Sequence, residues 1–262
     1  MKEIIKELSV FLEGNSKNQS IIYIHGFPYD HTMWKEQIDV LSKKYFCVTY
    51  DIRGLGDSPA GDGQYTMESF VDDLESILQQ LKLDKPVLCG LSMGGYISFR
   101  ALERMEEKFS AIVLCDTRSE ADNNEGKLKR AAAIKRINTE GLAPFAKDFI
   151  TNCFGDDYKQ NHKEDFEKQI AKSSSFNPVG VKGSLLAMIG RNDTTEYLSK
   201  IKIPALVICG EYDALTPPPL MKSMAEKINR AEFVIIKNSG HMSPIENPKE
   251  VNEAIQKFLN KL

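Results

Sequence analysis

Short apolar runs recur along the chain and alternate with longer amphipathic segments, and this alternation is the strongest constraint on the fold. The runs are rich in Val and Ile and are bounded by Gly, Pro or Asp, which is typical of buried strands. Such strands, separated by helices, indicate an α/β fold with a mostly parallel sheet covered on both faces. The predicted strands are Ile21 to Ile24, Phe46 to Tyr50, Val87 to Cys89, Ala111 to Cys115, Ala205 to Cys209 and Phe233 to Ile236.

The segments between the runs predict helices. Over 67–81, apolar residues recur at spacings of three and four, at Phe70, Leu74, Ile77, Leu78 and Leu81. Thr66 is the predicted N-cap of that helix, and Asn247-Pro248 supplies a cap and a first-turn proline for the last one. Further helices are predicted over 33–42, 96–105, 220–228 and 251–259, and 6–12 is predicted as an edge strand in a hairpin.

Residues 119–198 interrupt the alternation, because they contain helical patterns but no convincing strand. This segment is too long for an ordinary crossover between neighbouring strands. We therefore predict a core domain from 1–118 and 199–262, and a helical lid from 119–198 over the carboxyl edge of the sheet, where ligands bind in open α/β folds.

The charge balance argues against nucleic-acid binding, since 34 Lys and Arg face 37 Asp and Glu and the formal net charge is −3. The one basic cluster is interpreted as a solvated helix face; it contains Lys127, Lys129, Arg130, Lys135 and Arg136. No apolar run reaches ten residues, so we expect neither a membrane span nor a signal peptide, and a cytoplasmic location.

Cysteine and histidine usage gives no support for a metal site. The five cysteines form no Cys-x-x-Cys pair, and no two of the four histidines are spaced i, i+4. Free thiols are therefore expected, as in a reducing compartment. Gly54-Leu55-Gly56 is followed by Pro59 and does not fit the dinucleotide-binding pattern, and no phosphate-binding loop motif occurs. No cofactor is predicted.

The sharpest local motif runs from Gly90 to Gly95 and has the form G-x-S-x-G, between a predicted strand and a predicted helix. In this context the serine sits on a strained turn that demands small neighbours, and Gly90 and Gly94 provide them. Ser92 is therefore the candidate nucleophile. The turn also puts the N–H of Met93 at a helix N-terminus, where it can face an oxyanion.

A serine hydroxyl needs a base and an orienting carboxylate. His241 follows the last predicted strand, and Asp213 follows the strand before it. The order Ser92, Asp213, His241 is the nucleophile-acid-base order of a triad carried on an α/β sheet. Asp116 is a second candidate for the acid, ahead of Glu211 and Glu246, which are expected to be exposed.

The oxyanion hole needs a second N–H, expected from the loop after the first parallel strand. That loop starts at His25, interpreted as a structural hydrogen-bonding residue, and continues through Gly26 to Phe27 and Pro28. Pro28 has no N–H, so Phe27 is the expected donor. Phe27 and Met242 are the candidates for contact with substrate, because their neighbours in sequence are the proposed catalytic residues.

Taken together, these motifs resemble the α/β-hydrolase family, and most closely its carboxylesterase and 3-oxoadipate enol-lactonase-like branch. The resemblance spans nearly the whole chain, with a generic lid. It is carried by His25 to Pro28, Asp51 to Ser58, Gly90 to Gly95, Gly210 to Asp213 and Ser239 to His241.

The resemblance implies Ser92 as nucleophile, Asp213 and His241 as its partners, and Phe27 and Met93 as oxyanion donors. The implied activity is hydrolysis of a small-molecule carboxylic ester or lactone, with no metal or cofactor. Two alternatives remain open at this point. The same triad could serve carbon–carbon bond hydrolysis, perhydrolysis or cyanohydrin cleavage, or the chain could be a non-enzymatic ligand-sensing or partner-binding protein.

Overall fold

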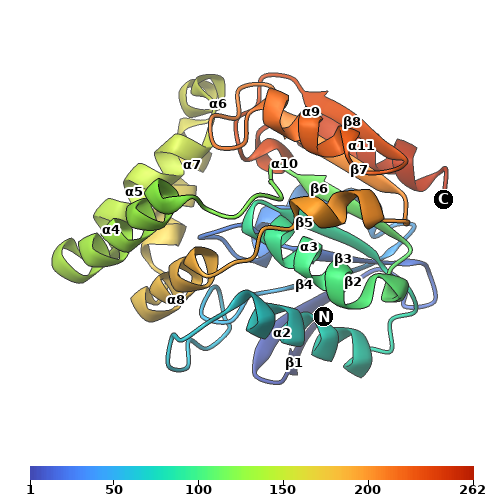
Figure 1. Cartoon of the computed structure of the whole chain (residues 1–262), viewed down its shortest axis with the longest axis horizontal. Coiled ribbons are helices and arrows are strands. Elements are labelled where there is room, and N and C mark those ends of the chain that lie inside the picture. The colour runs from blue at the N-terminus through green and yellow to red at the C-terminus, as the bar shows by residue number, and fades with distance from the viewer.

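The computed structural model describes all 262 residues and has an eight-stranded sheet at its centre (Figure 1). The strand order is β1-β2-β4-β3-β5-β6-β7-β8, and every pair from β4 to β8 is parallel. The predicted α/β fold is confirmed. The strands are β1 Lys2–Ile5, β2 Leu8–Glu13, β3 Ser20–Ile24, β4 Phe46–Tyr50, β5 Val87–Leu91, β6 Ala111–Cys115, β7 Ala205–Gly210 and β8 Ala231–Ile236.

The edge of the sheet differs from the prediction. Residues 6–12 were expected to form one strand of an edge hairpin; the hairpin is present, but Lys6 and Glu7 form its turn with positive φ angles, and β1 and β2 on either side are its two strands. β1 is hard to recognise because it pairs on one side only and one of its apolar residues, Ile4, is 63% exposed. An edge strand of this kind lacks the continuous apolar pattern of a buried one.

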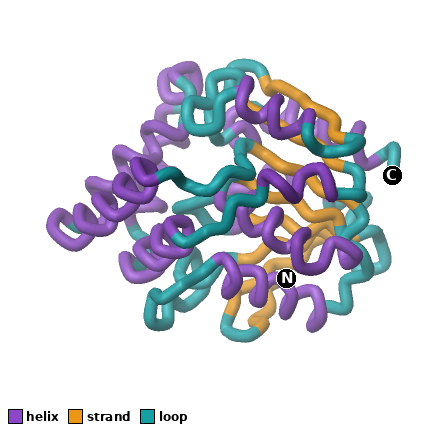
Figure 2. The backbone as a smooth tube through the Cα atoms, viewed as in Figure 1, coloured by secondary structure: helices purple, strands orange, loops and turns teal.

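Side chains of the central strands alternate between two apolar clusters, one on each face of the sheet. In β3, Ile22 and Ile24 belong to one cluster, and Ile21 and Tyr23 belong to the other. This period of two follows from strand geometry. Helices cover both clusters (Figure 2): α2 Met67–Gln80, α3 Met93–Met105 and α9 Pro218–Glu226 on the first, and α1 Lys35–Leu41 and α11 Pro248–Leu259 on the second.

The predicted helix caps are present. The Thr66 hydroxyl accepts a hydrogen bond from the N–H of Ser69 at the start of α2, and the Asn247 side chain accepts one from the N–H of Glu250 at the start of α11. The helix predicted over 33–42 is divided into a short 3₁₀ helix, His31–Trp34, and α1. Other short helices are η2 Glu106–Lys108, η3 Thr195–Lys200 and α10 Ser243–Glu246.

Five helices are inserted between β6 and β7, and they lie at the carboxyl ends of the strands, on the left of Figure 1. We call them the helical insertion. They are α4 Asn124–Glu140, α5 Leu142–Cys153, α6 Asp156–Asn161, α7 Lys163–Ser174 and α8 Pro178–Ile189. No helix in the chain has the length and apolarity that crossing a bilayer requires.

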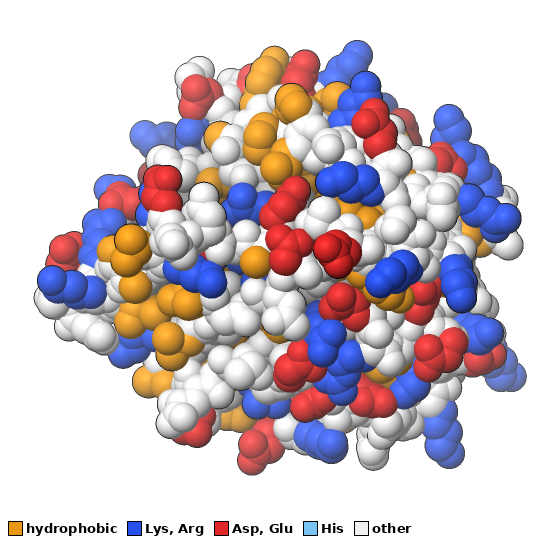
Figure 3. Space-filling view, viewed as in Figure 1, with side chains coloured by type: hydrophobic (Ala, Val, Ile, Leu, Met, Phe, Trp, Pro, Cys, Tyr) orange, Lys and Arg blue, Asp and Glu red, His pale blue; other side chains and the backbone are white.

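The surface carries interspersed acidic and basic side chains (Figure 3). In the basic cluster on α4, Lys127, Lys129 and Lys135 are exposed, as expected for a solvated face. Arg130 departs from this interpretation, because its guanidinium is mostly buried and pairs with Asp122. All five cysteines are buried free thiols.

Candidate active site

Ser92 occupies a sharp turn between β5 and α3, with φ 52° and ψ −114°. A non-glycine residue with such a backbone is strained and persists only where its surroundings enforce it. The surroundings here are backbone atoms. A Cβ on Gly90 would lie 2.5 Å from the carbonyl oxygen of Gly94, and a Cβ on Gly94 would lie 2.2 Å from that of Ile24 in β3. Both positions therefore admit only glycine.

Hydrogen bonds from the neighbouring strand hold the turn in place. The N–H of Ser92 donates to the carbonyl of Cys115 at 3.0 Å, and the hydroxyl of Thr117 donates to the carbonyl of Ser92 at 2.8 Å. The side chain of Ser92 is left partly exposed above the carboxyl edge of the sheet. The strained backbone of Ser92 is thus enforced by contacts with β6 as well as by the two glycines.

His241 and Asp213 form a buried pair on the loops after β8 and β7. The Nδ1 atom of His241 lies 2.8 Å from Oδ2 of Asp213, and the two residues are 4% and 2% exposed. Thr216 donates to Asp213 from its N–H and from its hydroxyl, and Leu215 donates from its N–H. The N–H of His241 donates to the carbonyl of Cys153 in α5. The imidazole is therefore fixed from both the core and the insertion.

The two ionisable groups stabilise each other's charged forms. Burial alone would raise the pKa of Asp213, but the charge of His241 and the hydrogen bonds to the carboxylate outweigh it and lower the pKa to about 2. Burial alone would lower the pKa of His241, but the carboxylate of Asp213 outweighs that effect and raises it above its ordinary value. Asp213 is thus an anion over the whole range in which His241 titrates.

Asp116, the second candidate for the acid, makes different contacts. Its Oδ1 accepts from the N–H of Gly210 at 2.7 Å, and its Oδ2 accepts from the hydroxyl of Ser243 at 2.5 Å. Burial first, and repulsion from Asp213 second, raise the pKa of Asp116 well above its ordinary value. No hydrogen bond joins it to His241. The geometry favours Asp213 as the partner of the imidazole.

The sequence predicted that Glu211 and Glu246 are both exposed. Glu211 is exposed, but Glu246 is half-buried. Glu246 accepts hydrogen bonds from the N–H of Gly155 at 2.8 Å and from the N–H of Met242 at 3.0 Å. Burial raises the pKa of its carboxyl, although these backbone donors oppose the shift. Its carboxylate connects the loop after α5 to the loop that contains His241. This contact is tertiary, so the position of Glu246 in the sequence does not reveal it.

The Phe27 loop lies close to the Ser92 turn, and Met93 follows Ser92 directly in the chain. A Cβ on Gly26, next to Phe27, would lie 3.5 Å from the Cβ of Ser92. The N–H of Phe27 donates to no protein acceptor, and Met93 is the first residue of α3, so its N–H has no acceptor within the helix. Neither backbone N–H therefore has an acceptor within the protein.

The side chains of Phe27 and Met242, the candidates for substrate contact, are both buried. The Phe27 ring packs edge-on against Phe149 at 5.3 Å between centroids and lies 6.3 Å from Phe145, both in α5. Met242 is 1% exposed and belongs to the apolar cluster beneath α11. The insertion therefore contacts the Phe27 loop directly.

A family model described as the α/β hydrolase fold matches residues 19–248. The chain belongs to the α/β-hydrolase family. It is 27% identical to 3-oxoadipate enol-lactonase 1 of Acinetobacter baylyi, over 98% of this chain and 94% of that protein. Among solved structures, a thermophilic esterase from Thermogutta terrifontis is 34% identical with a TM-score of 0.94, covering 100% of this chain and 98% of that one. An enol-lactonase from Burkholderia xenovorans LB400 is 25% identical, with a TM-score of 0.90 and 99% and 100% coverage.

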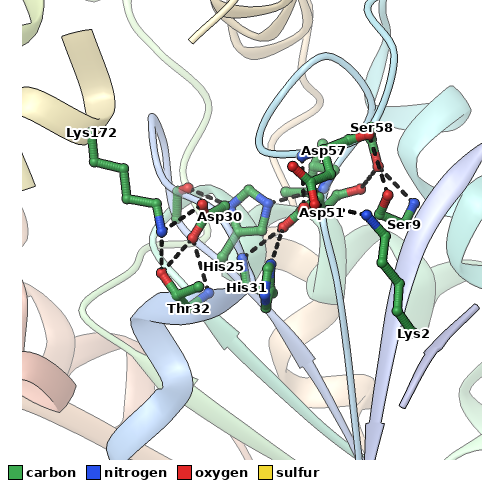
Figure 4. A network of polar contacts seen from close by, with 12 residues as sticks. Lys2, Ser9, His25, Asp30, His31, Thr32, Asp51, Asp57, Ser58 and Lys172 are labelled. Carbon is green, nitrogen blue, oxygen red and sulfur yellow. Dashed lines mark hydrogen bonds and ion pairs between the residues drawn. The ribbon is translucent and has the colours of Figure 1, made fainter. Parts of the chain in front are cut away.

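In this α/β hydrolase, a hydrogen-bonded network fixes the loop that contains Phe27 (Figure 4). His25 is fully buried; its Nδ1 lies 2.8 Å from the carbonyl of Gly26, and its Nε2 accepts from the N–H of Ile52 at 2.9 Å. Burial lowers the pKa of His25, so the ring is neutral. Asp51 accepts from the N–H and the ring of His31 and from the N–H of Asp57. The role of His31 was missed from the sequence, because its partner Asp51 lies just after β4, 20 residues further along the chain.

The helical insertion of the hydrolase is attached to the same loop by α7. The Lys172 ammonium lies 2.7 Å from Oδ2 of Asp30 and also contacts the Thr32 hydroxyl (Figure 4). The hydroxyl of Ser173, which is 1% exposed, donates to the carbonyl of Pro28 at 2.9 Å. The segment 28–32 is thus connected to α7 by an ion pair and by a buried hydrogen bond. We call these two contacts the α7 latch.

Two clusters bring together side chains of the kinds that bind metal ions: Asp30, His31 and Asp51, and Asp116, Cys209 and Asp213. The carboxylates of both clusters already accept hydrogen bonds from protein donors. Asp30 binds Lys172 and Thr32 in the first cluster, and Asp116 binds Gly210 and Ser243 in the second. The carboxylates that could bind a metal ion therefore already have partners within the protein.

We predict that Gly94→Ala destabilises the protein by about 1–3 kcal/mol, because the added methyl group meets the backbone of β3, which cannot move aside. Urea unfolding measures the change. Gly190→Ala is the matched control, since the nearest atom to its Cβ is at 3.8 Å. Equal midpoints for the two variants would contradict the close approach at Gly94.

A second prediction concerns the α7 latch. Ser173→Ala leaves the buried carbonyl of Pro28 without its donor, so we expect a loss of about 1–3 kcal/mol in the free energy of unfolding. Ser175→Ala, two residues further along, removes only a bond to the carbonyl of Lys172 at the surface and should cost less than half as much. Denaturant titration of both variants tests this, and similar losses would contradict it.

Proposed function

We propose that this α/β hydrolase cleaves a small-molecule carboxylic ester or lactone, with Ser92, His241 and Asp213 as its catalytic triad. The observation that carries the proposal is the buried 2.8 Å contact between His241 and Asp213, on the same sheet edge as the strained Ser92 turn. The enol-lactonases and the esterase to which the chain is similar add to it, because their names specify this class of reaction.

In the proposed mechanism, Asp213 holds Nδ1 of His241, which leaves Nε2 to accept the Ser92 proton as Oγ attacks the substrate carbonyl. The C–O bond to the leaving alcohol then breaks as the imidazolium returns the proton to that oxygen. A water molecule, deprotonated by His241, attacks the acyl carbonyl; the bond from that carbon to Oγ then breaks, the imidazolium returns the proton to Oγ of Ser92, and the acid is released. In a lactone, the alcohol and the acid are parts of one product molecule.

The N–H groups of Phe27 and Met93 would stabilise the oxyanion of both tetrahedral intermediates. Neither has another acceptor to give up, so they need little reorganisation as the charge develops. The Met93 N–H lies at the N-terminus of α3, where the helix dipole adds a favourable potential. Removing one such donor typically costs about 10²- to 10³-fold in kcat.

We further propose that residues 119–198 act as a lid over this site. The α7 latch and the contact of α5 with Phe27 support the assignment, because they attach the insertion to the loop that supplies an oxyanion donor. Phe27 and Met242 would form the wall of the acyl pocket, as their positions beside the donor and the base suggest. An apolar wall suits an uncharged ester or lactone.

The main test of the activity is Ser92→Ala. We expect ester and lactone turnover to fall by on the order of 10⁶-fold, because no other group can form the acyl-enzyme. Covalent labelling by a serine-reactive phosphonate, followed by mass spectrometry, should also disappear. Ser98→Ala, on the same helix, is the control and should keep both. Undiminished hydrolysis in Ser92→Ala would overturn the proposal.

The pH dependence tests the pairing of base and acid. His241 must be neutral to accept a proton, so kcat/KM should fall as pH falls through a pKa above the ordinary 6.5, because Asp213 raises it. In Asp213→Asn the rate should drop by about 10⁴-fold and the inflection should move to lower pH, since the largest effect that raises the pKa of His241 against burial is then lost. An unchanged inflection, measured with nitrophenyl esters, would exclude Asp213 as the partner of His241.

The same shifts predict how stability depends on pH. The contribution of His241 is fully present below pH 6.5 and is lost as pH rises through its raised pKa. The contribution of Asp213 is present above pH 3.8 and is lost as pH falls toward about 2. The free energy of unfolding of the wild type should exceed that of Asp213→Asn, and this difference should become smaller at both low and high pH.

A further inference from the structure

A cavity of about 250 Å³ lies at the base of the helical insertion, away from the proposed triad. One wall comes from the start of α2 and from the outer side of α3; the other comes from the two chain segments that enter and leave the insertion. None of Ser92, Asp213 and His241 contributes to it. We call it the arginine cavity. It is lined by Thr66, Met67, Glu68, Tyr96, Arg100, Arg118, Ser119, Gly190, Arg191, Asn192 and Thr194.

Three guanidinium groups face this cavity and only one carboxylate does. The carboxylate, Glu68, accepts from Nε of Arg100 at 2.5 Å and from Arg104 outside the cavity. Arg100 also pairs with Glu103. Hydroxyl and amide groups account for most of the remaining lining, and only two of its eleven residues are hydrophobic. The lining is therefore rich in hydrogen-bond donors, while Asp122, which lies outside the lining, compensates part of the charge of Arg118 and Arg191.

Arg191 is held rigidly in the wall. Its side chain is 3% exposed, pairs with Asp122 at 2.9 Å and donates to the carbonyls of Met188 and Glu120. Its guanidinium also stacks over the ring of Tyr96, with its central carbon 4.2 Å from the ring centroid. These contacts use the two terminal nitrogens, so the group is oriented before any ligand arrives.

Two donors in this wall have no partner. The Nε atoms of Arg118 and Arg191 are buried and make no hydrogen bond. Arg118 is the least engaged of the three arginines, because its one ion pair, to Asp122, spans 3.7 Å. Because these two atoms are covered by protein, a ligand in the cavity would meet the terminal nitrogens of Arg118 instead; that side chain is 34% exposed and makes no hydrogen bond. Its terminal N–H groups are therefore free for an acceptor. Asp122 cannot supply more, since it already serves Arg130 and Arg191.

We propose that the arginine cavity binds a small oxyanion, a carboxylate or a phosphate, through Arg118 with Arg100 and Arg191. The planar guanidinium fork matches the paired oxygens of these groups. The volume suits an ion of a few heavy atoms. The site is separate from the proposed triad, so it stands whether or not the chain hydrolyses esters.

Such an ion would connect α3 to both ends of the helical insertion, since Arg100 lies on α3, Arg118 on the entering segment and Arg191 on the leaving segment. A ligand that binds only the folded protein stabilises it by mass action. At a concentration about ten times its Kd, a single bound anion should raise Tm by about 3 to 6 °C for a chain of this size.

The test is calorimetric titration of the full chain with sodium phosphate and, separately, sodium succinate, at ionic strength held constant with sodium chloride. We expect one saturable site per chain and a matching rise in Tm. Saturation by phosphate alone assigns the site to phosphoryl groups, and saturation by succinate alone assigns it to carboxylates. The absence of saturable binding by both anions would overturn the proposal.

The Arg118→Gln variant tests whether the anion binds in the arginine cavity. It should weaken binding by about tenfold or more, the usual effect of removing a charge-assisted hydrogen bond. Arg136→Gln on α4 is the matched control, because its side chain is similarly exposed, 35% against 34%, and its partners Glu140 and Asp148 lie outside the cavity. Its affinity should equal that of wild type.

Arg100→Gln, on the opposite wall, is the second variant and should weaken binding as well; it decides the matter if Arg118→Gln does not fold. Wild-type affinity in both folded variants would overturn the proposal. Ser92→Ala should bind the anion as wild type does, so a failure of the proposed ester hydrolysis leaves this result unaffected. Loss of the site in Ser92→Ala alone would move the anion to the catalytic serine and contradict a separate cavity.

Discussion

The strained backbone at Ser92 is the constraint on which the rest of the site depends. A residue with φ 52° and ψ −114° would relax unless its neighbours prevented it. Three parts of the sheet do so: β5 leads into the turn, β3 presses against Gly94, and β6 accepts the N–H of Ser92. The turn can therefore exist only at the centre of an assembled parallel sheet. Its geometry also sets where Met93 begins α3 and where the serine side chain projects.

The two buried carboxylates near His241 illustrate how environment separates similar groups. Asp213 faces the imidazole and three other donors, which keep it ionised. Asp116 lies close by with fewer donors, and the charge of Asp213 adds to the cost of ionising it. Two adjacent buried carboxyl groups rarely ionise together. This difference gives the imidazole one anionic partner, as the role proposed for His241 requires.

The helical insertion shares structural elements with the core and is not a free appendage. It supplies the carbonyl that fixes the His241 backbone, and its α7 latch holds the loop that contains Phe27. Its two ends meet at Asp122, which pairs with Arg130 and Arg191. The surroundings of His241, the loop that contains Phe27 and the arginine cavity thus all depend partly on residues 119–198. Any movement of the insertion would act on all three.

The sequence by itself determined the sheet, the order of its central strands along the chain and the G-x-S-x-G turn, because period, length and glycine spacing are local properties. It also located His241 and Asp213 at strand ends. Only the tertiary structure decided which carboxylate contacts the imidazole, that Glu246 is half-buried and joins two loops, and that His31 binds Asp51. Those facts depend on which distant segments meet, and no local pattern records that. For the same reason the edge strand β1 and the arginine cavity became visible only after the chain was folded.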